Sequence, residues 1–124
     1  MVGTIFLKEE KMSLDVDLMV VKPVSVYEGN ITHNLGKMAS HVHVGDGLTL
    51  YDVLWRPDEH ELIYASDISD YLDIGWNVLM SEPNFYKTFN PENGWGSYEG
   101  LCKFVYNYRN ACWDNPDAEL RVSR

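Results

Sequence analysis

The spacing of the apolar residues changes twice along the chain, and this change limits the folds that the chain can adopt. Leucine or valine occupies every second position of residues 14–20, which is the spacing of a strand with one buried face. Residues 24–27 are predicted to form a second strand that ends at Gly29, and residues 118–124 alternate again. Between these ends, the apolar residues follow the spacing of amphipathic helices. The sequence therefore predicts an α+β fold: a small antiparallel sheet, made of two N-terminal strands and a C-terminal strand, covered by about three helices.

Each predicted helix begins after a residue that can cap it. The candidate caps are Thr32 or Asn30, then Ser66 or Asp67, and then Ser97. The apolar spacing of the first helix extends from Leu35 to Val42, and a glycine-rich turn at residues 45–47 ends it. The last helix carries an apolar stripe from Leu101 to Cys112 and ends before Pro116.

The chain has 124 residues, and we predict a single globular domain over residues 12–124. Residues 1–11 are predicted to be an N-terminal extension, because the first strand pattern begins directly after them. No segment approaches the roughly 20 apolar residues of a membrane span, and the start of the chain is not a convincing signal peptide. Cys102 and Cys112 lie in one predicted helix, where a rise of about 15 Å separates them beyond the reach of a disulfide. Reduced cysteines favour a cytoplasmic protein.

The chain is strongly acidic, with a formal net charge of −9 at pH 7. Such a chain repels the phosphate backbone of nucleic acids, so general nucleic-acid binding is not expected. The classes that remain are a binder of a small ligand and a binder of another protein. A homodimer is also compatible with a small sheet that has an exposed edge.

The first candidate site is the predicted start of the first helix. Its backbone N–H groups and helix dipole favour an anion such as phosphate or carboxylate. Polar and basic side chains add to these donors: Asn30, Thr32, His33, Asn34 and Lys37. The alternative interpretation is an ordinary helix cap with polar surface residues around it.

Two further candidates bring aromatic rings and a guanidinium. In the loop at residues 93–99, Trp95 and Tyr98 could stack on a planar ring while Asn93 and Glu99 contact its edge. The alternative is a tryptophan that fills the core from a tight turn. Trp55 and Arg56 form the other candidate, because arginine binds phosphate and carboxylate in a bidentate manner. Its alternative is a cation–π or ion pair at the edge of the core.

An enzyme is less favoured than a binding protein. The chain has no nucleophile elbow, no P-loop and no HExxH motif. His41 and His43 would point apart on a helix, so we predict no metal site, no cofactor and no catalytic residue. The one acid–base pair to test is His33 with Glu28 or Glu99.

Several of these stretches also resemble a family of small bacteriophage and prophage proteins to which no activity is assigned. The resemblance runs from about Met12 to Arg124, and its most specific stretches are Asn30–Ala39 and Asn90–Glu99. The matching segments read SLDVDLMVVKP, YEGNITHNLGKMA, LWRPDE, FNPENGWGSYEGLCKFV and PDAELRVSR. The resemblance implies an accessory phage protein in the host cytoplasm, and proteins of that kind often counter host defence.

The sequence and the resemblance together give one leading function and two alternatives. The leading function is a phage accessory protein that sequesters a small nucleotide-like ligand, such as an immune signal of the host. The first alternative is an acidic inhibitor that binds a host defence protein. The second is a small hydrolase or lyase that acts on nucleotides through His33 and a carboxylate.

Overall fold

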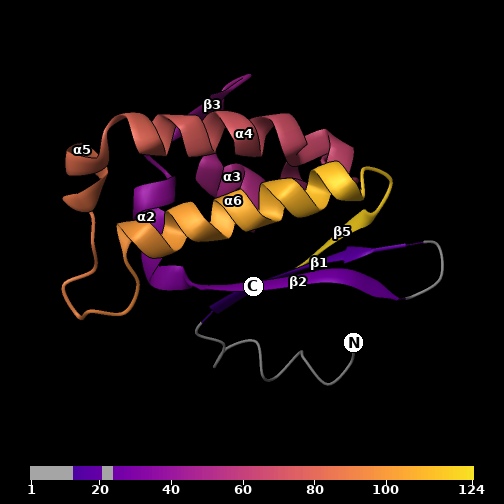
Figure 1. Ribbon diagram of the computed structural model, residues 1–124, viewed down its shortest axis with the longest axis horizontal. Helices are drawn as coiled ribbons and strands as arrows, with labels where there is room; N and C mark the ends of the chain where they lie inside the picture. The colour runs from indigo at the N-terminus through magenta and orange to yellow at the C-terminus, as the bar shows by residue number, and fades with distance from the viewer. Residues whose placement is uncertain (1–12, 21–23) are drawn as a thin grey trace.

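The fold is α+β, as the apolar spacing predicts. The computed structural model describes residues 13–20 and 24–124, so the predicted extension at residues 1–11 lies outside the described residues. An antiparallel sheet contains β1 (Ser13–Met19) in the centre, between β2 (Ser25–Thr32) and β5 (Glu119–Ser123). Figure 1 shows this sheet along one side of the molecule, with the helices on one of its faces. The C-terminal strand therefore pairs with the first strand of the chain.

The alternation in β1 decides which face of the sheet is covered. Leu14, Val16 and Leu18 are completely buried, whereas the residues between them are partly exposed. Leu14 pairs with Ile31 of β2, and Leu18 pairs with Leu120 of β5, so apolar residues of all three strands share the covered face.

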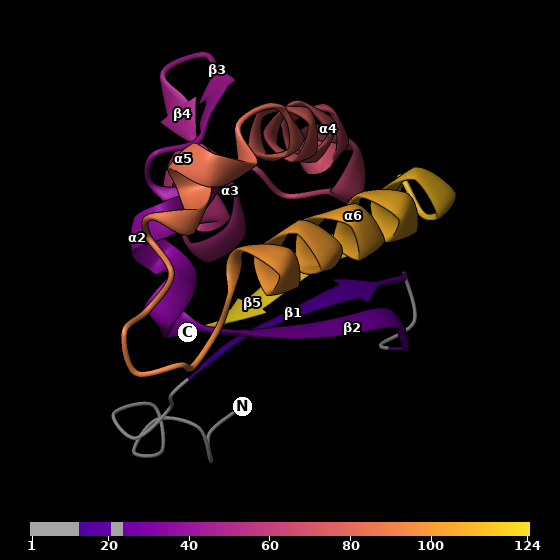
Figure 2. The same ribbon diagram turned by 60° about the vertical axis from the view of Figure 1, so that its left-hand side comes forward.

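Two long antiparallel helices form the cover. They are α4 (Ala65–Ser81) and α6 (Tyr98–Asp114). Figure 2 shows α6 lying directly over the sheet and α4 packed on the far side of α6. The shorter helices α2 (Gly36–Ala39), α3 (Leu50–Trp55) and α5 (Pro83–Lys87) complete the layer, with 3₁₀ turns at His33–Leu35 and Pro57–His60.

The predicted cap is confirmed at the start of α6 and is wrong at the start of α4, whose N-cap is Tyr64. The Ser97 Oγ accepts the Gly100 N–H at 3.0 Å, so Ser97 caps α6 as predicted. The start of α4 uses Asp67, whose carboxylate accepts the N–H groups of Ile63 and Tyr64 at 2.9 and 2.8 Å. Asp67 therefore reaches back from inside the first turn, and α4 begins at Ala65, one residue before the predicted cap Ser66.

The segment from Gly29 to Thr49 differs from the prediction. Strand β2 does not end at Gly29 but continues to Thr32. The first helix ends at Ala39, and the chain then forms a hairpin of β3 (His43–Gly45) and β4 (Leu48–Thr49). Val42 alone fits the predicted helical spacing, but Val42 and Val44 are both buried, which is the two-residue spacing of a strand. The glycine-rich turn favours the hairpin, because residues 45–47 all have the positive φ angles that tight hairpin turns need.

The core behind the sheet contains both cysteines as free thiols, as predicted. Burial raises the pKa of the Cys112 thiol to about 12, and it also raises the pKa of the Cys102 thiol. Across residues 13–20 and 24–124, no helix has the length and apolar character that a bilayer crossing requires.

Candidate functional site

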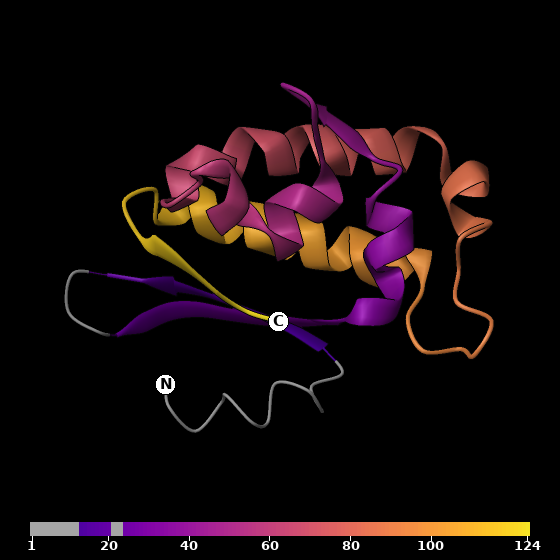
Figure 3. The same ribbon diagram turned by 180° about the vertical axis from the view of Figure 1, so that it is seen from behind.

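A pocket lies beside α3, the helix that is seen in front of α6 in the view of Figure 3. Its volume is about 370 Å³. The residues that line it come from the 3₁₀ turn after β2, from α3 and its C-cap, and from the residue after β5: His33, Tyr51, Trp55, Arg56 and Arg124. Segments that are far apart in the sequence, at His33 and at Arg124, therefore meet at α3.

The sequence around α3 fixes the geometry of the pocket. Thr49 and Asp52 form a capping box, in which the Thr49 Oγ1 accepts the Asp52 N–H at 3.3 Å and the Asp52 Oδ2 accepts the Thr49 N–H at 2.9 Å. Tyr51 and Trp55 are four residues apart on the helix, so their rings stack with centroids 5.2 Å apart and planes 12° apart. Arg56 precedes Pro57, which ends the helix and directs the Arg56 side chain to the rim.

His33 and Trp55 form the floor of the pocket. The Trp55 Nε1–H donates to the His33 Nδ1 at 2.7 Å, and Trp55 is only 2% exposed. The Trp55 indole therefore helps to set the position of the His33 ring beside α3.

Each arginine of the pocket is held by carboxylates of the 3₁₀ turn Pro57–His60. The Arg124 guanidinium binds the Asp58 carboxylate in a bidentate manner, with N···O distances of 2.8 and 3.1 Å, and it also donates to the Trp55 carbonyl. This guanidinium lowers the pKa of Asp58. The Arg56 Nη1 lies 3.0 Å from the Glu59 Oε2. The Tyr51 hydroxyl raises the pKa of Arg56, and Glu59 adds to the effect, so the rim stays cationic.

The structure brings together His33, Trp55 and Arg56 from the predicted site residues. The polar residues that are close to His33 in the sequence form local hydrogen bonds and do not line the pocket. The Asn30 amide donates to the Ser13 Oγ at 2.8 Å on the neighbouring strand, and the Thr32 Oγ1 caps the 3₁₀ turn by accepting the Asn34 N–H at 3.3 Å. Lys37 is exposed on α2 and does not line the pocket.

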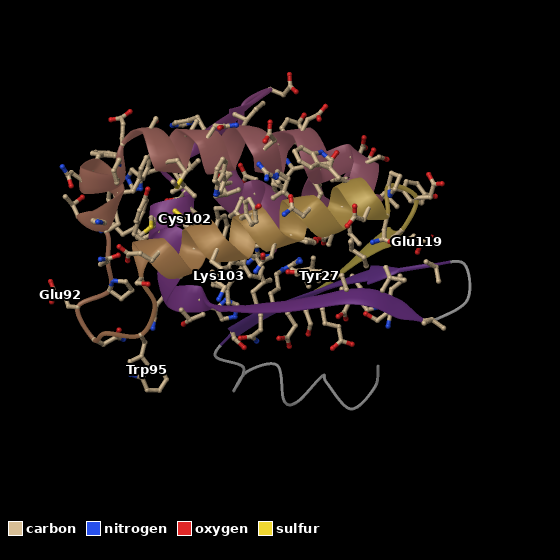
Figure 4. All side chains as sticks on the ribbon, in the orientation of Figure 1. Tyr27, Glu92, Trp95, Cys102, Lys103 and Glu119 are labelled. Carbon is tan, nitrogen blue, oxygen red and sulfur yellow. The ribbon has the colours of Figure 1, made fainter. Side chains whose placement is uncertain are left out.

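The loop at residues 93–99 packs against the start of the 3₁₀ turn but does not line the pocket. The Asn34 amide donates to the Trp95 carbonyl at 3.4 Å, and the Asn93 Oδ1 accepts the Trp95 N–H at 2.9 Å. Trp95 is 63% exposed, and Figure 4 shows its side chain pointing away from the helices. Glu99 pairs with Lys87 at 3.4 Å, so it lies apart from His33.

Tyr98 is a core residue, so its ring is not available for stacking on a ligand. It is 5% exposed, and its hydroxyl donates to the Leu79 carbonyl at 2.6 Å. In a continuous helix this carbonyl would accept from residue 83, but Pro83 has no N–H. Tyr98 therefore supplies the missing donor at the end of α4.

Sequence reasoning missed Tyr51 and Arg124 as pocket residues. The i, i+4 spacing of Tyr51 and Trp55 was a local signal for a stacked pair. Arg124 had no such signal, because only the pairing of β5 with β1 brings residue 124 to α3.

The arrangement can bind a ligand that accepts hydrogen bonds. None of the five described residues that line the pocket is a carboxylate, and three of them, Tyr51, Arg56 and Arg124, carry O–H or N–H donors. The acid–base pair of His33 with Glu28 or Glu99 is not assembled there, since neither carboxylate is among the lining residues. Comparison with protein-family models, with curated proteins and with solved structures finds no match to this chain.

Proposed function

We propose that the protein binds a small nucleotide-like anion in the pocket beside α3 and does not turn it over. The proposal rests on one observation: two guanidiniums, those of Arg56 and Arg124, line the same pocket as a stacked aromatic pair. Guanidiniums recognise phosphate oxygens through paired hydrogen bonds, and an aromatic face suits a planar base. The volume of about 370 Å³ lies in the range of small-molecule sites.

The role of each residue follows from its exposure. Trp55 is buried and supports the ring of Tyr51, which is partly exposed and can meet a base. Arg56 has a side chain that is 40% exposed, so it can turn toward a phosphate at little cost in packing.

The carboxylates of Asp58 and Glu59 compete with the ligand for the same guanidiniums. Because each arginine is already paired, a bound anion gains less than it would from free cations. The proposal therefore implies modest affinity in the natural chain. It also implies that removing a competing carboxylate strengthens binding.

In the phage context that the resemblance implies, binding alone is enough for a role in host defence. A protein that sequesters a nucleotide signal lowers its free concentration without any chemical step. This wider role rests on the resemblance, whereas the binding proposal rests on the pocket.

The test is isothermal titration calorimetry against mononucleotides, cyclic nucleotides and ADP-ribose. Adenosine and inorganic phosphate are titrated separately, to measure the contributions of the base and of the phosphate. Arg56→Gln should weaken nucleotide binding roughly 10- to 100-fold, the effect of a lost charge-assisted hydrogen bond. Arg121→Gln is the matched control, because Arg121 is exposed on β5 and outside the pocket. It should leave the affinity unchanged.

The decisive variant is Asp58→Asn, which removes a carboxylate near the pocket. We expect it to raise the affinity several-fold while lowering thermal stability slightly, because Arg124 loses its partner. A structural role for Arg124 alone predicts only the loss of stability. The proposal is wrong if the whole panel fails to bind at millimolar concentration, or if Arg56→Gln binds as well as the natural chain.

A further inference from the structure

A second cluster lies outside the pocket, along the seam between α4 and α6. Trp76 of α4 and Tyr106 and Trp113 of α6 surround the guanidinium of Arg109. The Arg109 Cζ lies 5.0 Å from the Trp76 ring centroid, 4.9 Å from that of Tyr106 and 4.4 Å from that of Trp113. We call these three rings, with Arg109 beneath them, the seam cluster.

The exposed faces of Tyr106 and Trp113 place the seam cluster on the surface of the helical layer. Figure 4 shows Cys102 between α4 and α6 on the side that faces the viewer. Residues 106, 109 and 113 follow Cys102 at helical spacing, so they continue the same stripe of α6. None of the described residues that line the pocket beside α3 belongs to α4 or α6.

Internal contacts satisfy the arginine but leave the rings partly uncovered. Arg109 is 8% exposed, and its Nη1 lies 2.9 Å from the Asp73 Oδ1, with further hydrogen bonds to the Asn110 side chain. Tyr106 and Trp113 are 42% and 49% exposed. Holding α4 to α6 requires the arginine and the contacted ring faces. It does not require two large rings to present half of their surface to water.

The composition of the seam cluster is that of a binding hot spot. Tryptophan, tyrosine and arginine are the residue types that carry most of the energy of protein interfaces. The rings are fixed by Arg109 and by the contact of Trp76 with Tyr106, whose centroids are 5.6 Å apart. A partner would therefore meet a surface that is already ordered, which lowers the entropic cost of binding.

The charges around the seam cluster decide the kind of partner. Helix α4 contains three aspartates and no lysine or arginine, and Asp114 directly follows Trp113 at the end of α6. The one cation within the seam cluster, Arg109, is buried and paired with Asp73. A second copy of a chain with a net charge of −9, a nucleic acid and an anionic membrane would all meet repulsion here.

We propose that the seam cluster docks a cationic, arginine-bearing segment of another protein. An arginine of the partner would stack on the exposed faces of Trp113 and Tyr106 and pair with Asp114 or with Asp70 on α4. This proposal is independent of the nucleotide pocket. It gives a physical basis to the alternative that the acidic chain inhibits a host protein.

The test uses an arginine-rich synthetic peptide, with lysine-rich and glutamate-rich peptides of the same length as comparisons. The four tryptophans of the chain give four indole N–H signals in a ¹H–¹⁵N spectrum, which report on different places. The arginine peptide should shift the signals of Trp76 and Trp113 and leave those of Trp55 and Trp95 in place. The lysine peptide should bind more weakly, and the glutamate peptide should not bind.

Variants separate stacking from general attraction between charges. Trp113→Ala should weaken arginine-peptide binding roughly tenfold or more, as truncation of a hot-spot tryptophan does. Trp95→Ala is the matched control, because Trp95 is an even more exposed tryptophan outside the seam. Asp114→Asn should weaken binding several-fold and reduce its dependence on salt.

Four results would overturn the proposal. They are no shift of Trp76 and Trp113 at millimolar peptide, equal effects of Trp113→Ala and Trp95→Ala, equal binding of the glutamate peptide, and self-association that Trp113→Ala abolishes. The last result, measured by sedimentation, would assign the surface to a second copy of the chain. Thermal melting of each variant shows that it is folded before its binding is compared.

Discussion

The attachment of the loop at residues 93–99 to the 3₁₀ turn of the pocket can be tested with a pair of glycines. Gly94 and Gly96 lie in the same loop and both have positive φ angles, +77° and +107°. A Cβ added at Gly94 would meet no atom within 4 Å. A Cβ added at Gly96 would lie 2.8 Å from the Thr32 Cγ2 and 3.0 Å from the Leu35 Cγ. The two alanine variants share backbone strain, and only the second adds a steric clash.

The expected loss of unfolding free energy is the sum of the backbone strain and the steric clash. An alanine with positive φ costs about 1–2 kcal/mol, part of which is offset because alanine restricts the unfolded chain. Overpacking a well-filled site costs about 1–3 kcal/mol more. Thr32 cannot turn away freely, because its Oγ1 caps the 3₁₀ turn, and Leu35 is 1% exposed. Gly94→Ala should therefore cost about 1 kcal/mol, and Gly96→Ala about 2–4 kcal/mol.

Urea unfolding followed by tryptophan fluorescence measures both free energies. The slope with urea should be the same in both variants, so that the midpoint alone reports the difference. Gly96→Ala should also lower the melting temperature further than Gly94→Ala, by roughly 4 °C for each kcal/mol in a chain of this size. Equal losses in the two variants would refute the reasoning, because the loop would then not be pressed against Thr32 and Leu35.

Three further predictions concern α6 and its contacts. Tyr98→Phe should cost about 1–3 kcal/mol of unfolding free energy, because the buried Leu79 carbonyl loses its donor, and calorimetry should show unchanged nucleotide binding. Ser97→Ala should cost about 1 kcal/mol in urea unfolding, and Ser97→Thr should retain most of the cap. Since burial raises the pKa of Cys112 to about 12, its thiol should react with a thiol reagent at neutral pH only after unfolding. Stability should also fall as the pH rises above about 9, because the unfolded thiol then ionises and the folded thiol does not.

The sheet and the long helices could be predicted because their signals are local and repeated. Leu14, Val16 and Leu18 alternate over a whole strand, and Ser97 precedes an apolar stripe of several turns. The hairpin at residues 43–49 could not be recognised in the same way. Val42 fits the i+7 position of a helix as well as a strand, and the burial of Val44 and the positive φ angles at the following turn distinguish the two.

The candidate site could be predicted only where its residues are neighbours in sequence. Trp55 and Arg56 are adjacent, and His33 lies in a polar turn, so all three carried visible signals. The stretch around Trp95 also resembled a binding loop in its sequence, but its glycines serve the packing of the loop. Glycines beside a tryptophan are expected where a ligand approaches the backbone, but also where a loop packs closely on another segment, as Gly96 does on Thr32 and Leu35.

The two proposed sites should respond in opposite ways to salt, because the whole chain carries 19 acidic and 10 basic residues. A nucleotide approaches a protein of like charge, so its association rate should rise when salt shortens the screening length from about 30 Å at low salt to about 8 Å at physiological salt. A cationic peptide approaches a protein of opposite charge, so its association rate should fall over the same range. Stopped-flow fluorescence of the two reactions measures both rates in the same buffers. If nucleotide association also slowed with salt, Arg56 and Arg124 would outweigh the carboxylates that hold them, and the competition inferred for Asp58 and Glu59 would be wrong.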